Sequence, residues 1–210
     1  ILLLLPVSTT GSISLIDALF TTTSAVCVTG LVALDTSKDF TLFGQTVIMV
    51  MIQAGGLGIL TFASYFSYFF KGGSSYEDQL TMGNISNIEK IDEIFKTLKR
   101  ILIITVGIEA VGAFFIFTSL SSALMPGLSD RIYFSVFHSI SAFCNAGFDI
   151  LGTSANPFPS LTGYSANVLV NVVIMLLIII GGIGFLTWDD IYTNKMKFKR
   201  YRMQSKIILV

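Results

Sequence analysis

The sequence predicts an all-α membrane protein, and charge and hydropathy are the first two observations that lead to this class. The chain of 210 residues is 53% hydrophobic and 12% charged, with a mean hydropathy of +0.78, whereas an ordinary soluble domain carries about 25% charged residues. No Asp, Glu, Lys, Arg or His lies between Phe40 and Phe70 or between Ile150 and Trp188. A helix of about 20 apolar residues crosses a bilayer core of about 30 Å. These runs are too continuous for membrane β-strands, so we expect helices.

A short segment that occurs twice is the third observation. Residues 24–30 read SAVCVTG and residues 141–147 read SAFCNAG, at an offset of 117 residues that also aligns Ser12 with Ser129 and Phe20 with Phe137. Each copy lies between a short helix-like run and a long apolar run. We therefore expect repeated membrane helix–pore helix–membrane helix units with reentrant filter loops.

The first unit begins with the end of an outer helix and continues with a short helix over about 14–24. Ser14 followed by Asp17 resembles a capping box, so Ser14 is the expected N-cap. This helix is too short to span a bilayer. Residues 26–31, called segment 1 below, form an extended candidate filter. A polar loop over 32–40 and a spanning helix over about 42–70 complete the unit.

The second unit repeats this order after a charged stretch. We divide the chain into 1–70 (end of the first outer helix, pore loop and inner helix of repeat 1), 71–95 (cytoplasmic linker), 96–189 (repeat 2) and 190–210 (cytoplasmic basic segment and start of a further helix). The expected elements are an amphipathic piece near 85–95, spanning helices over about 97–120 and 163–188, a short helix over 130–142 with Ser129 as N-cap, and the second candidate filter at 143–148, called segment 2. Because both chain ends lie in apolar runs, we expect a fragment of a larger polytopic protein.

Basic residues set the expected orientation. Eleven of the thirteen Lys and Arg residues lie in 71–100 and 189–206, and only Lys38 and Arg131 lie on the other side. The positive-inside rule therefore places both segments toward the outside of the cell inner membrane in a multi-pass topology.

The repeated glycines indicate what the segments do. An ion loses its hydration shell at low cost where a ring of backbone carbonyls replaces the water. Turning carbonyls inward requires backbone angles that glycine tolerates, and Gly30 and Gly147 occupy equivalent positions. The preceding short helices end with partial negative charge, which favours a cation. The candidate ion-binding residues, through their carbonyls, are Val26, Cys27, Val28, Thr29, Gly30, Phe143, Cys144, Asn145, Ala146 and Gly147, with side chains mostly packed away.

Several other features allow two interpretations. Residues 55–58 and 181–184 repeat the pattern Gly-Gly-x-Gly, which favours close helix packing, with a hinge as the second choice. Glu109 either forms a structural hydrogen bond or handles ions directly, and His138 is either structural or pH-sensitive. The repeated cysteines are expected to pack behind the filter. Three aspartates near the segments either concentrate cations or are solvated loop charges: Asp35, Asp39 and Asp149.

Catalysis and nucleic-acid binding are not expected. The net charge is zero and the chain has a single His. No nucleophile–base pair, zinc-type Cys/His cluster or phosphate-binding loop is visible. We therefore expect no enzyme activity, no bound cofactor and no metal other than potassium at the filter carbonyls, as substrate.

At segments 1 and 2 the sequence resembles the Trk/Ktr/HKT cation transporter superfamily, specifically its bacterial TrkH/KtrB-type potassium-translocating subunits. The resemblance extends over nearly the whole chain and covers the first two of four repeats. It implies potassium uptake through a carbonyl-lined selectivity filter, and Gly30 implies potassium over sodium. It also implies a homodimer in membrane lipid on a cytosolic nucleotide-binding regulatory subunit. A sodium- or proton-coupled potassium symporter and an incomplete scaffold fragment inactive alone remain the alternatives.

Overall fold

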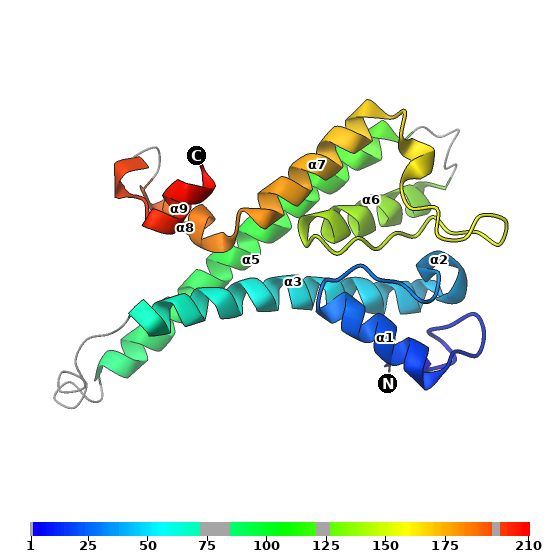
Figure 1. Ribbon diagram of the computed structural model, residues 1–210, viewed down its shortest axis with the longest axis horizontal. Helices are drawn as coiled ribbons and strands as arrows, with labels where there is room; N and C mark the ends of the chain where they lie inside the picture. Colours follow the sequence, from blue (N-terminus) through cyan, green and yellow to red (C-terminus); the bar gives the residue numbers. More distant parts are fainter. Residues whose placement is uncertain (1, 72–84, 121–126, 195–197) are drawn as a thin grey trace. The chain divides into compact units, whose positions relative to one another are not determined.

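The structure is a computed structural model that describes residues 2–71, 85–120, 127–194 and 198–210. Every regular element in these ranges is a helix, and the one strand-like pairing there is an isolated bridge between Thr9 and Phe40. This agrees with the predicted all-α class. In chain order (Figure 1) the elements are η1 (Leu2–Leu4), α1 (Leu15–Val26), α2 (Thr36–Asp39), α3 (Leu42–Lys71), α5 (Ile85–Ser119), α6 (Leu128–Phe143), η2 (Thr162–Tyr164), α7 (Val168–Gly182), α8 (Phe185–Asn194), η3 (Phe198–Arg200) and α9 (Met203–Ile208).

The two short helices begin in different ways. At α1 the Ser14 side chain accepts from the Asp17 N–H (3.1 Å) and its hydroxyl donates to the Asp17 carboxylate (2.7 Å), so the predicted N-cap is confirmed. At α6 the N-cap is Gly127, and the prediction of Ser129 is wrong. The Asp130 carboxylate lies against Gly127, where any side chain would meet it. A glycine therefore fits this cap, and the helix starts one residue before Ser129.

Two of the predicted spanning helices differ from the prediction in their extent. The amphipathic piece near 85–95 and the span over 97–120 form one continuous helix, α5. The expected helix over 163–188 is wrong, because the chain breaks between α7 and α8. The cause is Gly184, which adopts a left-handed φ of 83° and whose carbonyl accepts from the Thr187 N–H (3.2 Å) at the start of α8. Most of the predicted linker, 72–84, lies outside the described residues.

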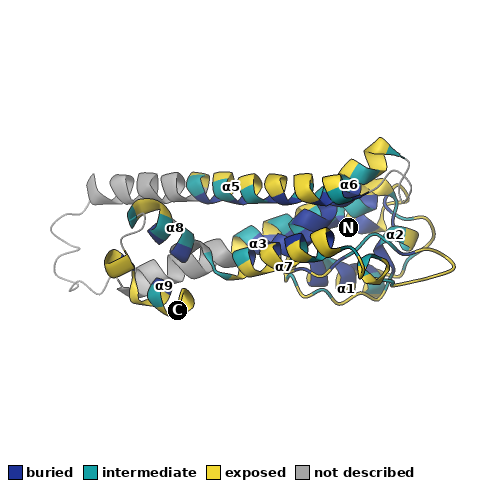
Figure 2. Cartoon of the chain, turned by 90° about the horizontal axis from the view of Figure 1, so that it is seen from above, coloured by how far each residue is buried: buried dark blue, intermediate teal, exposed yellow. Residues whose placement is uncertain are grey.

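Apolar residues cover the outer faces of the long helices. Within the part of the chain that the structure describes, the stretch Lys99–Ser119 of α5 is long and apolar enough to cross a membrane, and Leu15–Val26, Leu42–Gly58 and Val168–Gly182 are shorter apolar helical stretches. Exposed faces of α5 and α7 appear in Figure 2. Apolar surface of this kind is typical of a membrane or protein contact. The large exposed apolar side chains on these two faces include Val111, Phe114, Phe115, Val168, Val172, Met175, Leu176 and Ile179.

The chain divides into two compact units, and the larger unit contains both repeated segments. This unit comprises Ile1–Leu57 and Ile108–Gly182. Its core draws on both repeats, because side chains from α1 and α3 pack with side chains from α6 and segment 2. Burying one such apolar side chain stabilises the fold by about 1.5–3 kcal/mol. The buried cluster consists of Leu3, Ala18, Ala25, Phe40, Ile48, Ile52, Phe137, Ala146 and Phe148.

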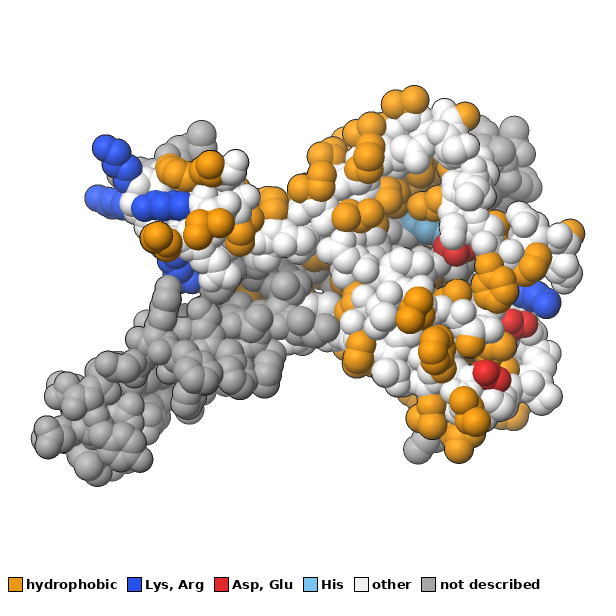
Figure 3. All heavy atoms as spheres, in the orientation of Figure 1, with side chains coloured by type: hydrophobic (Ala, Val, Ile, Leu, Met, Phe, Trp, Pro, Cys, Tyr) orange, Lys and Arg blue, Asp and Glu red, His pale blue; other side chains and the backbone are white. Residues whose placement is uncertain are grey.

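The second unit comprises Gly58–Gly107 and Ile183–Val210. A buried carboxylate, Asp190, joins α8 to the start of α9. It accepts from the Arg202 N–H (2.9 Å) and from the Ser205 hydroxyl (2.5 Å). The Arg202 side chain adds an ion pair at 3.5 Å. Lys and Arg side chains gather around the C-terminal helices of this unit in Figure 3.

Candidate functional site

The helices that precede the two segments end in the same way. After α1 the Val28 N–H donates to the Ala25 carbonyl (3.2 Å) and the Thr29 N–H donates to the Ser24 carbonyl (2.8 Å). After α6 the corresponding bonds run from Asn145 to Ala142 (3.0 Å) and from Ala146 to Ser141 (2.7 Å). Both pairs have the pattern of a Schellman motif. The repeat in sequence is therefore also a repeat in backbone hydrogen bonding.

Left-handed residues recur at the same places in both segments. Val28 has φ 54° and Gly30 has φ 77°, while Asn145 has φ 60° and Gly147 has φ 72°. Glycine and asparagine adopt this region readily. A β-branched valine is a genuine outlier there, so the surrounding packing must hold Val28 in place.

Segments 1 and 2 lie against each other at their glycines. A Cβ atom on Gly30 would overlap the Ala146 carbonyl oxygen and would lie 3.4 Å from the Gly147 Cα. A Cβ atom on Gly147 would lie 3.6 Å from the Gly30 Cα. The structure therefore brings together the two positions that the sequence repeat singles out.

The Gly-Gly pairs of α3 and α7 pack against the ends of the short helices. A Cβ atom on Gly55 would overlap the Val26 carbonyl oxygen, and one on Gly181 would overlap the Phe143 carbonyl oxygen. Val26 and Phe143 are equivalent in the repeat, so this contact is made twice. Gly56 faces the Cys144 thiol, with 2.6 Å between a Cβ placed on Gly56 and the sulfur. The interpretation as close-packing positions is confirmed for Gly55, Gly56 and Gly181, whereas no atom lies within 4 Å of a Cβ placed on Gly58 or Gly184 and the helix breaks at Gly184.

The ten predicted ion-binding residues differ in exposure. In segment 1 the side chains of Val26, Cys27 and Thr29 are exposed, so the expectation that they pack away is wrong there. In segment 2 Phe143 and Ala146 are buried as expected, whereas Asn145 and Gly147 are exposed. The assignment of the carbonyls as ion ligands stays a prediction.

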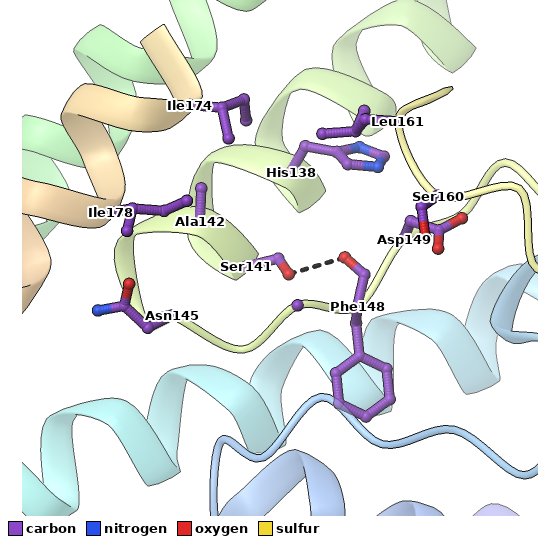
Figure 4. Close-up of a pocket in the computed structure, with 11 residues that line it drawn as sticks. His138, Ser141, Ala142, Asn145, Phe148, Asp149, Ser160, Leu161, Ile174 and Ile178 are labelled. Carbon is purple, nitrogen blue, oxygen red and sulfur yellow. Dashed lines mark hydrogen bonds between the residues drawn. The ribbon is translucent and has the colours of Figure 1, made fainter. Parts of the chain in front are cut away.

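A pocket of about 310 Å³ lies beside segment 2. Figure 4 shows that its wall comes from α6, α7 and the loop that follows segment 2. The Ser141 hydroxyl donates to the Phe148 carbonyl (2.7 Å), so segment 2 is tied back to α6. The lining residues are His138, Ser141, Ala142, Asn145, Gly147, Phe148, Asp149, Ser160, Leu161, Ile174 and Ile178.

His138 is buried in α6 and has a structural hydrogen bond, as one of the two interpretations predicted. Its Nδ1 lies 2.9 Å from the Phe134 carbonyl oxygen, and its ring packs 4.0 Å from the Phe134 ring centroid. Since a carbonyl can only accept, Nδ1 carries the proton in this contact.

Asp35 is a structural residue that the sequence left ambiguous. It is 5% exposed and caps α2 by accepting from the Ser37 and Lys38 N–H groups (3.0 and 3.2 Å). It also accepts from the Phe158 N–H (2.8 Å), which belongs to the loop after segment 2. Asp35 is thus a buried acceptor that joins the loops of the two repeats, rather than a solvated loop charge.

Asp149, directly after segment 2, leads to a prediction about pH. Burial raises the pKa of its carboxyl, the Leu151 N–H (3.0 Å) lowers it, and the charge of Asp35 raises it further. A raised pKa means that the folded protein binds this proton more tightly than the unfolded chain. The stabilisation is complete below the unfolded pKa of about 3.9 and is lost as the pH rises through the folded pKa.

We expect Asp149→Asn to unfold at a higher temperature than the wild type at neutral pH, because the amide cannot ionise. The gain should shrink as the pH falls toward 4. Thermal unfolding in detergent across a pH series measures both the difference in unfolding temperature and its dependence on pH. A lower unfolding temperature for the variant at neutral pH, or a difference that does not depend on pH, would contradict the assignment.

Comparison with known proteins identifies the family. The profile of the TrkH cation transport proteins matches residues 3–208. This chain belongs to the TrkH family. The resemblance to the Trk/Ktr/HKT superfamily is therefore confirmed, and membership of a transport family agrees with the expectation that the protein is not an enzyme. TrkH-family relatives also support a membrane location.

Three relatives within the TrkH family show how far the similarity extends. Ktr system potassium uptake protein B of Bacillus subtilis is 39% identical over 100% of this chain and 45% of the relative. Potassium/sodium uptake protein NtpJ of Enterococcus hirae is 39% identical over 92% of this chain and 41% of the relative. Ktr system potassium uptake protein B of Vibrio alginolyticus is 34% identical over 100% of this chain and 45% of the relative. The chain thus spans less than half the length of these relatives.

Proposed function

We propose that this chain supplies part of a potassium-translocating pore, in which segments 1 and 2 are reentrant loops that line the ion path with backbone carbonyls. One observation carries the proposal. Two segments with the same left-handed positions and the same helix endings meet at Gly30 and Gly147. A pore with internal pseudosymmetry requires equivalent elements that face a shared axis.

The chemistry of passage follows from this arrangement. Potassium exchanges its water shell for carbonyl oxygens of segments 1 and 2, and the membrane potential drives its entry. The C-terminal ends of α1 and α6, which point at the segments, carry partial negative charge that favours a cation. Non-helical backbone at this depth is tolerated where it lines a water-filled path. Potassium is the substrate, and no resident cofactor is required.

The proposed pore selects potassium over sodium. The resemblance associates a glycine at the position of Gly30 with potassium and a serine with sodium. Two of the relatives are named potassium uptake proteins. A Cβ atom at Gly30 would meet the Ala146 carbonyl, so a larger residue would change the spacing between the segments.

Orientation and partners complete the proposal. By the positive-inside rule, the basic residues of 71–100 and 189–206 support a cytoplasmic location for these stretches and an outward position for the segments. We place the protein in the cell inner membrane as a multi-pass protein. The name Ktr system, carried by two of the relatives, supports a system of several subunits, and the family resemblance implies a homodimer with a cytosolic nucleotide-binding regulatory subunit.

A coupled symporter is the second candidate, because one relative is named a potassium/sodium uptake protein. A symporter would stop carrying potassium when both the sodium and the proton gradient are removed, whereas a pore would continue. An inactive scaffold fragment is the third candidate, since the chain spans less than half of its relatives. Expression of this chain alone, beside the protein at its natural length, distinguishes that case.

Rescue of potassium-starved cells tests the proposal. We expect the protein at its natural length to restore growth at low potassium, and Gly30→Ser to lower the preference for potassium over sodium. Gly11→Ser is the matched control, because no atom lies within 4 Å of a Cβ placed on Gly11. An unchanged potassium preference in Gly30→Ser would refute the assignment of segment 1 as a filter.

A further inference from the structure

A polar cluster lies behind segment 2, at the meeting of three helices. Glu109 of α5 is 7% exposed, and its Oε2 accepts from the Gln53 Nε2 of α3 (3.1 Å). The Gln53 Oε1 lies 3.9 Å from the Cys144 thiol, which donates to it at the end of α6. A continuous contact therefore runs from the carboxyl group through the amide to the first residue after α6.

The position of the carboxyl group is set by backbone contacts. The Ser139 hydroxyl of α6 donates to the Glu109 carbonyl (2.7 Å). Gly112, one turn later in α5, faces the Ser139 Oγ, with 2.7 Å between a Cβ placed on Gly112 and that oxygen. These contacts hold α5 against α6, so the Glu109 side chain enters the cluster from a fixed place.

The thiol has little room on the other side. Gly56 lies one turn after Gln53 on the same face of α3, and a Cβ placed on it would be 2.6 Å from the Cys144 sulfur. The thiol is thus confined between the Gln53 amide and Gly56. Its counterpart in segment 1, Cys27, is exposed.

The free-energy cost of burying this polar cluster indicates that it serves a function. A carboxyl group within a spanning helix is expensive and is found where function or pairing requires it. The Glu109 Oε1 atom is buried and has no hydrogen-bond partner, which adds to the cost. The Glu109 Oε2 accepts from the Gln53 amide nitrogen, and this bond leaves the amide oxygen facing Cys144.

We propose that Glu109, acting through Gln53, is a positioning residue that holds the Cys144 thiol and thereby the backbone of segment 2, and so helps to determine which monovalent cation passes. The role in ion choice rests on the proposed pore function, whereas the positioning of the thiol does not. Glu109 is separated from segment 2 by the Gln53 side chain, so it acts on the ion path indirectly.

Thiol labelling tests the positioning step without any reference to transport. The protein at its natural length reacts with N-ethylmaleimide, and mass spectrometry of the Cys144 peptide gives the rate. We expect Glu109→Gln, whose amide oxygen can still accept from Gln53, to label at the wild-type rate. Glu109→Leu leaves the Gln53 amide without its acceptor and should label on the order of tenfold faster. An equal labelling rate in Glu109→Leu and wild type would overturn the proposal.

A double variant separates positioning from general stability. Gln53→Leu/Glu109→Leu removes both polar partners, and such paired replacement restores stability better than the loss of one partner. Compared with Glu109→Leu, we expect the double variant to give more folded protein but no higher ratio of potassium to sodium uptake. We expect Glu109→Gln to keep the wild-type ratio. If the double variant restores the ratio as well, Glu109 is merely structural. If the wild type carries no potassium, the proposed pore fails while the labelling result still decides the positioning role.

Discussion

Replacing Gly30 by alanine is expected to lower both the rate of potassium uptake and the unfolding temperature. Two physical costs coincide at this position. Alanine resists the left-handed φ of 77°, which costs about 1–2 kcal/mol, and its methyl group would overlap the Ala146 carbonyl oxygen. Overpacking of this kind typically costs about 1–3 kcal/mol. The overlap forces segments 1 and 2 apart at the place where they meet.

Gly147→Ala provides a graded comparison. Gly147 has a similar φ of 72°, but its added Cβ would make only an ordinary contact, 3.6 Å from the Gly30 Cα. We therefore expect a smaller loss of stability than in Gly30→Ala, since only the backbone cost remains. A bulky replacement such as Gly147→Leu should stop uptake. Potassium uptake in starved cells and thermal unfolding in detergent measure the series. Equal effects in Gly30→Ala and Gly11→Ala would contradict the contact between the segments.

Replacing Gly55 or Gly181 by alanine is expected to have the second large effect, on folding itself. Gly55 lies in the middle of α3, where alanine is intrinsically favoured by about 1 kcal/mol, and Gly181 lies in the last turn of α7. The added methyl group would nevertheless overlap a backbone carbonyl, that of Val26 or of Phe143. A backbone atom cannot turn away as a side chain can, so overpacking of about 1–3 kcal/mol or more prevails over helix propensity.

Gly58→Ala is the matched control within the same motif. Gly58 lies in α3, and no atom lies within 4 Å of a Cβ placed on it. Helix propensity alone acts there, so this variant should unfold at the same temperature as the wild type or slightly higher. The yield of folded protein and its unfolding temperature in detergent are the measurements. A decrease in Gly58→Ala as large as that in Gly55→Ala would show that the carbonyl contact is not the cause.

The sequence predicts structure best where the physical signal is local. The Ser14 cap depends on atoms three residues apart, and the apolar runs that predict α3 and much of α5 depend on neighbours along one helix. The repeat pointed to Gly30 and Gly147 because equivalent backbone conformations call for the same residue type. The positions at which a helix breaks are harder to predict from the sequence. Gly58 and Gly184 occupy equivalent positions in the two motifs, yet α3 continues through Gly58 whereas Gly184 separates α7 from α8.

By itself the sequence determined the all-α class, the family and the register of the two repeats, because hydropathy, composition and glycine spacing are properties of the chain alone. Only the tertiary structure decided which groups meet. The Asp35 carboxylate accepts from the Phe158 N–H, and the Gln53 amide links Glu109 to Cys144. These partners are far apart in the sequence, and residue type alone does not select them. Their meeting depends on how closely α3, α5 and α6 approach, which is set by small residues such as Gly56 and Gly112 at the contacts.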